Sequence, residues 1–229
     1  MNIEIDKVYN MDCLDLMQEM IKQGIKADWC IADPPYGIGI EKMSFTQSGA
    51  KTIGKATRRD YTSVGEWDKE RLTQDYFDLM FQCSKNQIIF GGNYYTDILP
   101  PTKSWIVWDK RCDNNLRNDF ADCELAWCST GQARVFRYLY NGILQDDMKN
   151  KDERFHPTQK PTQLWCMLLN YYTKENDLIL DPFAGSQSLR IACHKLQRQY
   201  IGFEIDKEYY DKGCEWYNKF ASQISMFDL

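Results

Sequence analysis

Two short apolar runs, each ending in an acidic residue and an abrupt turn, constrain the fold of this chain most strongly. Residues 28–32 lead into Asp33-Pro34-Pro35-Tyr36, and residues 177–180 lead into Asp181-Pro182-Phe183-Ala184-Gly185-Ser186. Apolar runs of this length are typical of strands buried in a parallel sheet. Because open α/β sheets bind ligands at the carboxyl ends of their strands, we expect both turns to line one pocket.

The first motif has the groups needed to methylate the exocyclic amine of a nucleic-acid base. The Asp33 carboxylate and the Pro34 carbonyl are two acceptors that can turn the amine lone pair toward a methyl donor held in line. Tyr36 offers a flat face to a base taken out of its helix, and Pro34 and Pro35 hold the acceptors rigidly. The alternative is an ordinary strand-ending turn, because Asp and Pro are common turn residues.

The second motif has the form of a strand, a tight turn and a helix over residues 186–196. Gly185 lets a ligand approach the backbone, and the helix start offers free amides to a polar ligand edge. Residues 199–203 predict another strand, which ends at Glu204. An acidic residue about twenty positions beyond a Gly turn is typical of ribose binding, although Glu204 alone could be a solvated strand end.

Four sequence signatures together resemble those of the S-adenosylmethionine-dependent DNA amino-methyltransferases of the permuted β group. In that family the Asp-Pro-Pro-Tyr motif precedes the Gly-containing cofactor motif, as it does here. His156-Pro157-Thr158-Gln159-Lys160-Pro161 resembles a third family signature, and Asn10-Met11-Asp12-Cys13 resembles the family's opening. The resemblance spans nearly the whole chain and implies S-adenosylmethionine as the cofactor.

The resemblance also implies roles for individual residues. Thr158 and Lys160 would hold the methionine carboxylate of the cofactor, and Asp12 would contact its adenine. Asp12 taken alone would equally suit the N-cap of a helix over residues 14–23. The implied catalytic residues are Asp33, Pro34, Pro35 and Tyr36. The implied cofactor-binding residues are Asp12, Cys13, Asp33, Thr158, Lys160, Asp181, Phe183, Ala184, Gly185, Ser186 and Glu204.

One position departs from the family pattern. The family usually has a second glycine after Gly185-Ser186, where this chain has Gln187. We expect Gln187 to lie in the first helical turn, where Gln is tolerated and Gly costs about 1 kcal/mol. Cofactor binding should then survive the change.

The order of predicted elements indicates a single α/β domain over residues 1–229. Further strands are predicted at residues 87–93, 105–108 and 124–127, and helices at residues 162–172, 186–196 and 207–220. Such an alternation favours a mostly parallel sheet with helices on both faces. The resemblance implies a Rossmann-like, mixed seven-stranded sheet with one antiparallel strand, in circularly permuted order.

Composition narrows the class of protein. Nine cysteines without a Cys-x-x-Cys pair argue against a disulfide framework and a zinc site, so we expect reduced thiols, no metal and a cytoplasmic protein. No apolar run is long enough to span a bilayer, and the opening residues do not resemble a secretion signal.

The net charge of -5 does not favour nucleic acid, so any DNA contact must come from local basic segments. Residues 41–65 predict a mobile loop that faces DNA, although a merely solvated loop would have the same composition. A second irregular region, residues 109–155, predicts small target-recognition insertions. The candidate DNA contacts in the two regions are Lys51, Lys55, Arg58, Arg59, Lys110 and Arg111.

The favoured function is transfer of a methyl group to adenine N6 in double-stranded DNA, with a restriction-modification partner, an orphan modifier and a mobile-element enzyme all open as its setting. Cytosine N4 is the closest alternative, because the same acceptors suit either amine, and a catalytically idle DNA-binding module that senses the cofactor is another. The resemblance is compatible with a homodimer. Residues 223–227 resemble a peptide that docks onto the bacterial sliding clamp, but packing against the chain's own domain is favoured.

Overall fold

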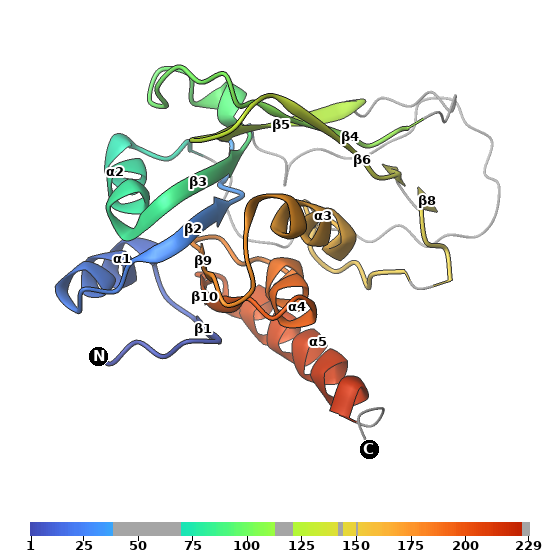
Figure 1. Cartoon of the computed structure of the whole chain (residues 1–229). Coiled ribbons are helices and arrows are strands. Elements are labelled where there is room, and N and C mark those ends of the chain that lie inside the picture. Colours follow the sequence, from blue (N-terminus) through green and yellow to red (C-terminus); the bar gives the residue numbers. More distant parts are fainter. Residues whose placement is uncertain (39–69, 113–120, 142–143, 150, 226–229) are drawn as a thin grey trace.

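The computed structural model describes residues 1–38, 70–112, 121–141, 144–149 and 151–225. Within these ranges one mixed sheet has the strand order β1-β10-β9-β2-β3-β5-β4-β6 (Figure 1). Its strands are β1 (Lys7–Tyr9), β2 (Ala27–Ala32), β3 (Ser84–Phe90), β4 (Ile106–Asp109), β5 (Cys123–Cys128), β6 (Arg134–Arg137), β9 (Leu178–Asp181) and β10 (Gln199–Phe203). A separate hairpin pairs β7 (Tyr140–Asn141) with β8 (Leu144–Gln145). The expected loop at 41–65, with Lys51, Lys55, Arg58 and Arg59, lies outside the described residues.

The sheet confirms the mixed, mostly parallel architecture, but it has eight strands in the described ranges where seven were expected. Strand β5 is antiparallel to both of its neighbours, β3 and β4, and the remaining pairs are parallel. The edge strand β6 was not predicted. Only Phe136 of its four residues is buried, so the strand lacks the apolar run that revealed the others.

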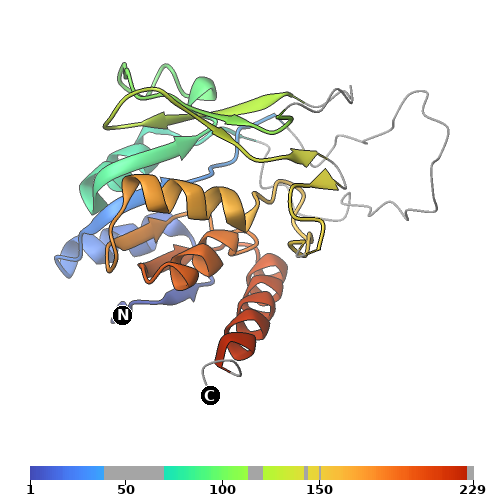
Figure 2. The same cartoon turned by 45° about the vertical axis from the view of Figure 1, so that its right-hand side comes forward.

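Helices cover both faces of the sheet, as expected (Figures 1 and 2). Two of them, α1 (Cys13–Lys22) and α2 (Gln74–Cys83), pack against each other on one face. On the opposite face α3 (Thr162–Tyr172) packs against α4 (Ser188–Lys195). The last helix, α5 (Lys207–Ser225), lies beside α4, and a short 3-10 helix, η2 (Gly92–Tyr94), follows β3.

Alternating side chains of the central strands build a separate core on each face. Trp29 and Ile31 of β2 join the cluster under α3 and α4. Cys30 and Ala32 join the cluster under α1 and α2. This period of two is the geometry of a strand buried on both sides, and it explains why β2 is apolar from Trp29 to Ala32.

Most predicted helices lie where the sequence placed them, with shifted ends. Residues 162–172 form α3 as predicted. Asp12 caps α1, because its side chain accepts a hydrogen bond of 2.8 Å from the Leu14 amide. Helix α5 continues to Ser225, so Gln223 lies inside the helix and not after it. Met226 and Phe227 of the clamp-like segment lie outside the described residues.

The parallel part of the sheet brings the motif residues to one edge. Strands β1, β10, β9, β2 and β3 run in the same direction, so the segments that follow them meet at their carboxyl ends. Strand β2 pairs directly with β9, through Trp29 with Ile179 and Cys30 with Leu180. The two motifs, about 150 residues apart in sequence, therefore lie side by side.

Other predictions concern the chain as a whole. All nine cysteines carry free thiols, and six of them are buried. Across the described ranges, no helix combines the length and the hydropathy needed to cross a membrane. In the same residues, His, Cys, Asp and Glu side chains form no group of three that could hold a metal ion.

Candidate active site

A cavity of about 610 Å³ opens at the carboxyl edge of the sheet and joins the two motifs. Every predicted catalytic and cofactor-binding residue lines it. The four residues of the first motif form one part of its wall, and the turn after β9 forms another. The volume is in the range of known ligand sites, and one cavity could therefore hold a cofactor beside a second substrate.

Tyr36 is held in place beside Asp33 in this cavity. Its hydroxyl donates a hydrogen bond of 2.7 Å to Oδ1 of Asp33, and its ring stacks on Tyr94 with the centroids 4.9 Å apart. Gly91, in the left-handed region at φ +64°, lies directly against the ring. A Cβ built on Gly91 would approach Tyr36 Cε1 to 2.1 Å, so only glycine fits beneath this tyrosine. The Tyr95 hydroxyl donates a hydrogen bond to the Pro35 carbonyl, which fixes the next turn of the motif.

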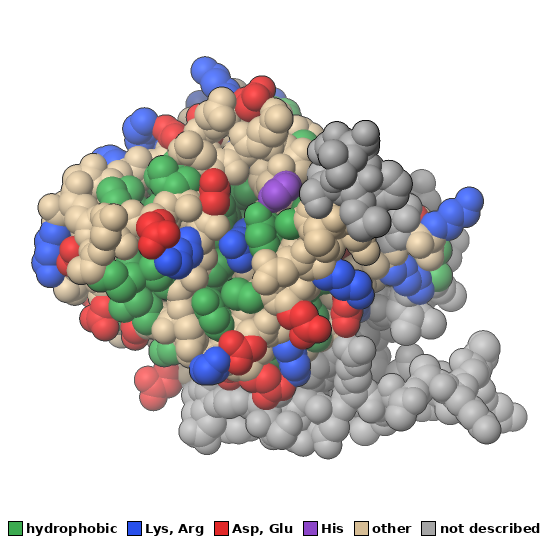
Figure 3. Space-filling model, turned by 90° about the horizontal axis from the view of Figure 1, so that it is seen from below, with side chains coloured by type: hydrophobic (Ala, Val, Ile, Leu, Met, Phe, Trp, Pro, Cys, Tyr) green, Lys and Arg blue, Asp and Glu red, His purple; other side chains and the backbone are tan. Residues whose placement is uncertain are grey.

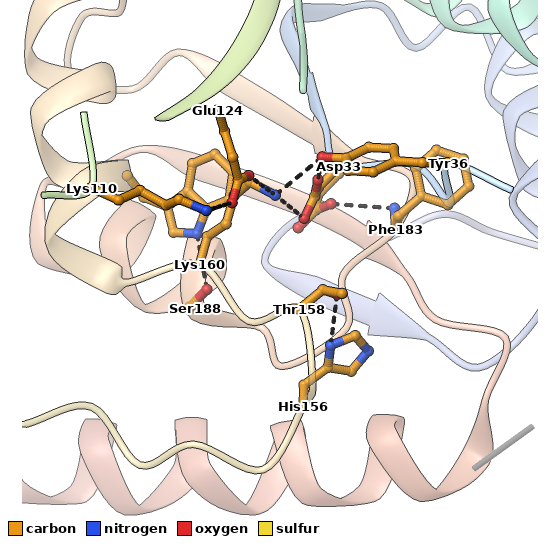
Figure 4. A network of polar contacts seen from close by, with 11 residues as sticks. Asp33, Tyr36, Lys110, Glu124, His156, Thr158, Lys160, Phe183 and Ser188 are labelled. Atoms are coloured by element: carbon orange, nitrogen blue, oxygen red, sulfur yellow. Dashed lines mark hydrogen bonds and ion pairs between the residues drawn. The ribbon is translucent and has the colours of Figure 1, made fainter. Parts of the chain in front are cut away.

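Lys160 contacts the Asp33 carboxylate at its other oxygen (Figure 4). Its ammonium group forms an ion pair with Oδ2 of Asp33 and a second one, of 3.3 Å, with Oε2 of Glu124. Lys110 pairs with the other oxygen of Glu124 at 3.0 Å. Figure 4 shows these side chains as one chain of alternating charges that ends at Asp33.

Burial and charge oppose each other in this network. Burial raises the pKa of Asp33 above its ordinary value, Lys160 lowers it, and the nearby Glu124 raises it further. The pKa of Glu124 is lowered, because Lys160 and Lys110 together outweigh the effect of burial. The two carboxylates also raise the pKa of Lys160, so the lysine remains charged although its side chain is only 4% exposed.

Glu204 closes the glycine turn at the other end of the cavity. Its two carboxylate oxygens accept hydrogen bonds from the amides of Gly185, at 2.7 Å, and Asp206, at 2.8 Å. The turn is also tied to the sheet, because the Ala184 amide donates to the Phe203 carbonyl. Burial raises the pKa of Glu204 to about 7, although both amide hydrogen bonds favour its charged form.

Asp181 is a second buried carboxylate beside Glu204. It accepts hydrogen bonds from the Tyr200 hydroxyl, at 2.8 Å, and from the Phe183 amide, at 3.3 Å. Burial raises its pKa to about 7 despite these donors. Asp12, Asp181 and Glu204 thus present hydrogen-bond acceptors to the cavity. Ribose hydroxyls, an amino group and an exocyclic amine are donors that such acceptors can bind.

His156 supports the wall between the two ends of the cavity. Its ring packs on Tyr209 with the centroids 4.1 Å apart, and Nδ1 lies 3.2 Å from the Thr158 hydroxyl. Burial, with a contribution from Lys160, lowers the pKa of His156 to about 3. A ring that stays neutral at ordinary pH can orient the Thr158 hydroxyl through Nδ1.

The conformation of Gln187 corrects the expectation that it lies in the first turn of the helix. It precedes α4 as the N-cap residue, at φ +63° and ψ +22°, a left-handed conformation that suits the family's glycine. Its side chain is fully buried, where it donates to the Tyr210 carbonyl at 3.1 Å and accepts from Arg190 at 3.0 Å. These contacts hold a residue type that would otherwise avoid this backbone geometry.

Lys110 and Arg111, both candidate DNA contacts, do not line the cavity. Lys110 is paired with Glu124, and Arg111 is paired with Asp122 at 2.6 Å. The face in Figure 3 likewise has Lys and Arg side chains close to Asp and Glu side chains, without one large basic patch. Lys110 and Arg111 are therefore each paired with a carboxylate.

The sequence did not single out several residues of the site. Glu124 is the most important, and its only signal was a charge at the start of an otherwise apolar strand. Tyr94 had no sequence signal for its stacking on Tyr36. The remaining unpredicted residues on the cavity wall include Tyr76, Gln159, Ile205 and Tyr209.

Comparison with known proteins identifies the family to which this site belongs. A family model described as DNA methylase, of the N6/N4 type, matches residues 93–215. The methylase YubD of Escherichia coli K12 is 40% identical over 213 residues, which cover 88% of this chain and 86% of YubD. The chain belongs to the N6/N4 DNA methylase family. The type II methyltransferase M2.MboI of Moraxella bovis is a further relative of this methylase, 24% identical over 93% of this chain and 87% of M2.MboI.

Solved structures share the fold of this methylase. M1.HpyAVI in complex with S-adenosylmethionine superposes with a TM-score of 0.57 at 22% identity, over 91% of this chain and 98% of that one. The cytosine-N4-specific PvuII DNA methyltransferase gives a TM-score of 0.54 at 14% identity, over 93% and 92% of the two chains. Both confirm the α/β methyltransferase architecture.

The cavity of the methylase fits S-adenosylmethionine, the cofactor of this family. Glu204, Asp181 and Asp12 supply acceptors, and Phe183 and Ile205 supply apolar surface for an aromatic base. Gly185 lines the cavity at φ +49°, in the left-handed region that favours glycine, and a Cβ built on it would be in ordinary contact with His156 at 3.5 Å. When bound, the cofactor would supply an activated methyl group.

Proposed function

We propose that this methylase transfers the methyl group of S-adenosylmethionine to N6 of an adenine that has been flipped out of double-stranded DNA. The observation that carries the proposal is that Asp33 and Tyr36 line the same cavity as Asp12, Asp181 and Glu204, the carboxylates to which we assign cofactor binding. The carboxylate can accept a hydrogen bond from the exocyclic amine, and the Tyr36 ring offers a stacking face. An Asp at the first position of the motif leans toward adenine in the resembling family.

Asp33 orients the amine in this proposal and does not activate it by removing a proton beforehand. A carboxylate is a weak base for a neutral aromatic amine, whereas a positioned acceptor can turn the lone pair toward the methyl group. The nitrogen attacks the methyl carbon, the carbon–sulfur bond breaks, and the methylated nitrogen then releases a proton to a nearby base. No covalent enzyme intermediate is needed.

The residue roles that follow are also proposals. Asp33, Pro34, Pro35 and Tyr36 bind and orient the base. Glu204 and Asp181 bind the ribose of the cofactor and the atoms next to it. Asp12 and Cys13 contact its adenine. Thr158 and the turn from Phe183 to Ser186 hold its methionine end. Lys160 is the exception among the residues assigned to the methionine carboxylate, because its donors face Asp33, Glu124 and Tyr36.

Cytosine N4 is the second candidate substrate, because the same acceptor can orient either amine. The test is incubation of unmethylated genomic DNA with labelled S-adenosylmethionine, followed by digestion to nucleosides and mass spectrometry. N6-methyladenine would support the proposal, and N4-methylcytosine would replace the substrate but keep the chemistry. Cofactor binding without any labelled DNA would contradict both candidates and favour the idle, cofactor-sensing module.

The relatives suggest a cellular setting. M2.MboI is a type II methyltransferase by name. We propose that this methylase likewise protects DNA within a restriction-modification system. Digestion of methylated and unmethylated DNA by a panel of restriction endonucleases would identify both the protected sequence and the class of partner endonuclease.

A further inference from the structure

Two carboxylates share one buried ammonium group beside the reaction centre. Lys160 lies between Asp33, at the end of β2, and Glu124, near the start of β5. Its Nζ also lies 3.5 Å from the Tyr36 hydroxyl and 4.7 Å from the centroid of the Phe90 ring. Almost no water reaches the lysine, so these groups define its surroundings.

Both oxygens of Asp33 already have partners in this arrangement. Oδ1 accepts from the Tyr36 hydroxyl, and Oδ2 pairs with Lys160. A carboxylate offers about four lone-pair directions, so Asp33 can still accept the N–H of an arriving amine. A cation bound to Asp33 alone would nevertheless weaken it as an acceptor. The second carboxylate, Glu124, gives that cation another partner.

We propose that Glu124 is a positioning residue for methyl transfer: it holds Lys160 so that the ammonium group aligns Asp33, and it takes a larger share of that group when the target amine binds. The proposal rests on the proposed function, because it concerns the carboxylate that orients the amine. Asp33 and Glu124 both form ion pairs with Lys160, and Glu124 does not line the cavity, so Glu124 acts on the substrate indirectly.

The charges of the three groups support this role. Asp33, Lys160 and Glu124 together carry a net charge of -1, which Lys110 at the outer oxygen of Glu124 balances, so the negative charge of Asp33 lies at the inner end of the network. During transfer, positive charge develops on the amine nitrogen as the carbon–sulfur bond breaks and the nitrogen–carbon bond forms. A fixed negative charge next to that nitrogen stabilises the transition state, most strongly in a cavity that excludes water. Lys110 pairs with the outer oxygen of Glu124 and holds the carboxylate in place.

The same neighbours predict how Asp33 titrates. Four groups face it or its partner directly: Lys160, Tyr36, Glu124 and the carboxylate of Asp181 on β9. Glu124 raises the pKa of Asp33 and Lys160 lowers it. Removing the charge of Glu124 should therefore lower the pKa of Asp33, and removing the charge of Lys160 should raise it. A residue that only supported the fold would shift the pKa in neither direction.

The test compares Glu124→Gln with Lys160→Met in the full chain. We expect Glu124→Gln to lower the rate of methyl transfer to unmethylated genomic DNA at least about tenfold, with cofactor affinity changed less than about twofold by calorimetry. The acidic limb of its pH–rate profile should move to lower pH. The corresponding limb of Lys160→Met should move to higher pH. Glu124→Asp, which keeps the charge, should leave the limb where the wild-type protein has it.

A matched control removes a lysine–carboxylate pair far from the cavity. Lys85 pairs with Asp28 at 2.7 Å near the opposite ends of β3 and β2, so Lys85→Met should leave both the rate and the pH profile unchanged. Carbon-13 NMR titration of the Asp33 carboxylate, assigned with Asp33→Asn, gives a second measurement that needs no turnover. If Lys160→Met does not fold, the downward shift in Glu124→Gln carries the test alone.

Three results would overturn the proposal. They are wild-type turnover in Glu124→Gln, an unchanged Asp33 titration in that variant, and shifts of the same sign in Glu124→Gln and Lys160→Met. A wild-type protein that methylates no DNA would instead refute the proposed function. The NMR titration would still decide whether Glu124 and Lys160 control Asp33, so the two failures are distinguishable.

Discussion

The side chain of Gln187 occupies the space that a side chain on Gly213 of α5 would need: a Cβ built on Gly213 would lie 2.6 Å from Nε2 of Gln187. Gln187 has the left-handed backbone conformation at which a glycine is favoured, and its buried side chain bonds to Tyr210 and Arg190. The absence of a side chain at Gly213 thus makes room for the one residue that departs from the family's cofactor motif. The turn and α5 are coupled through this contact.

The coupling predicts that the effect of Gly213→Ala on stability changes sign when Gln187 is replaced. Gly213→Ala alone should destabilise the protein by about 1–3 kcal/mol, because Gln187 cannot leave its slot without losing hydrogen bonds. In the Gln187→Gly background the same substitution should stabilise by about 1 kcal/mol, the usual gain of Ala over Gly within a helix. Chemical denaturation of the four proteins measures the double-mutant cycle, and additive effects would show that the two positions are independent.

Gly91→Ala should displace Tyr36. The new methyl group would overlap the tyrosine ring, so we expect methyl transfer to fall at least about tenfold while cofactor affinity by calorimetry changes little. Gly24→Ala is the matched control, because Gly24 has a similar φ of +70° but nothing within 4 Å of its Cβ position. That control should show only the backbone cost of about 1–2 kcal/mol in stability, with normal turnover in the folded protein. Equal losses of turnover in both variants would contradict the assignment of Tyr36.

Asp33→Ala should abolish detectable transfer and leave cofactor binding nearly intact. Loss of one preorganised polar group of this kind costs about 10²–10³ in turnover. Lys160 keeps Glu124 as a partner at 3.3 Å, so the buried ammonium is not left unpaired and the protein should fold. Single-turnover assays and calorimetry on the same preparation separate the two effects. An active Asp33→Ala protein would remove Asp33 from the proposed mechanism.

Glu204 makes the stability of the cofactor-free protein depend on pH. Its pKa is about 7 in the folded protein and 4.5 in an ordinary environment, so between these values the folded state binds more protons than the unfolded state. The contribution of Glu204 to stability therefore falls as pH rises from about 4.5 to about 7. Relative to Glu204→Gln, the wild-type protein should lose stability between about pH 5 and about pH 7.5, as measured by urea unfolding.

The difference between the two proteins is the required measurement, because other groups also titrate in this range. Asp181, with a pKa of about 7, acts in the same direction, whereas His156, with a pKa of about 3, acts in the opposite one. Asp181 and His156 are present in both the wild-type protein and the variant, so their contributions to the pH dependence of stability cancel from the difference. A constant difference across the pH range would mean that Glu204 is ionised in the folded protein throughout.

The parts of the fold that the sequence predicted correctly are those with strong local signals. Strands β2, β9 and β10 are continuous apolar runs ended by Asp33, Asp181 and Glu204. Their turns contain Pro or Gly, and the family motifs added the order of the elements. Local chemistry and position along the chain agreed, so the cavity could be predicted with the motif residues of its wall.

The parts that the sequence could not predict depend on tertiary context. Strand β6 has a single buried side chain, Phe136, and pairs only with β4. Thr73 precedes helix α2 and makes no side-chain cap hydrogen bond that would mark the start of the helix. Glu124 reaches the active site because β5 runs against its neighbours, which places the beginning of that strand at the edge where the others end. Nothing local to residue 124 encodes this reversal.

The direct pairing of β2 with β9 also has a consequence for synthesis and folding. Trp29 cannot find its partner Ile179 until 150 further residues have been made, so the centre of the sheet forms through contacts of very long range. Such contacts slow folding, and chains emerge from the ribosome with the amino-terminal part first. Strand β2, which ends at Asp33, therefore has one edge unpaired until β9 has been made. A nascent chain truncated before β9 would hold the catalytic motif and have no methyl donor to use, so premature release yields an inert fragment with an exposed strand edge.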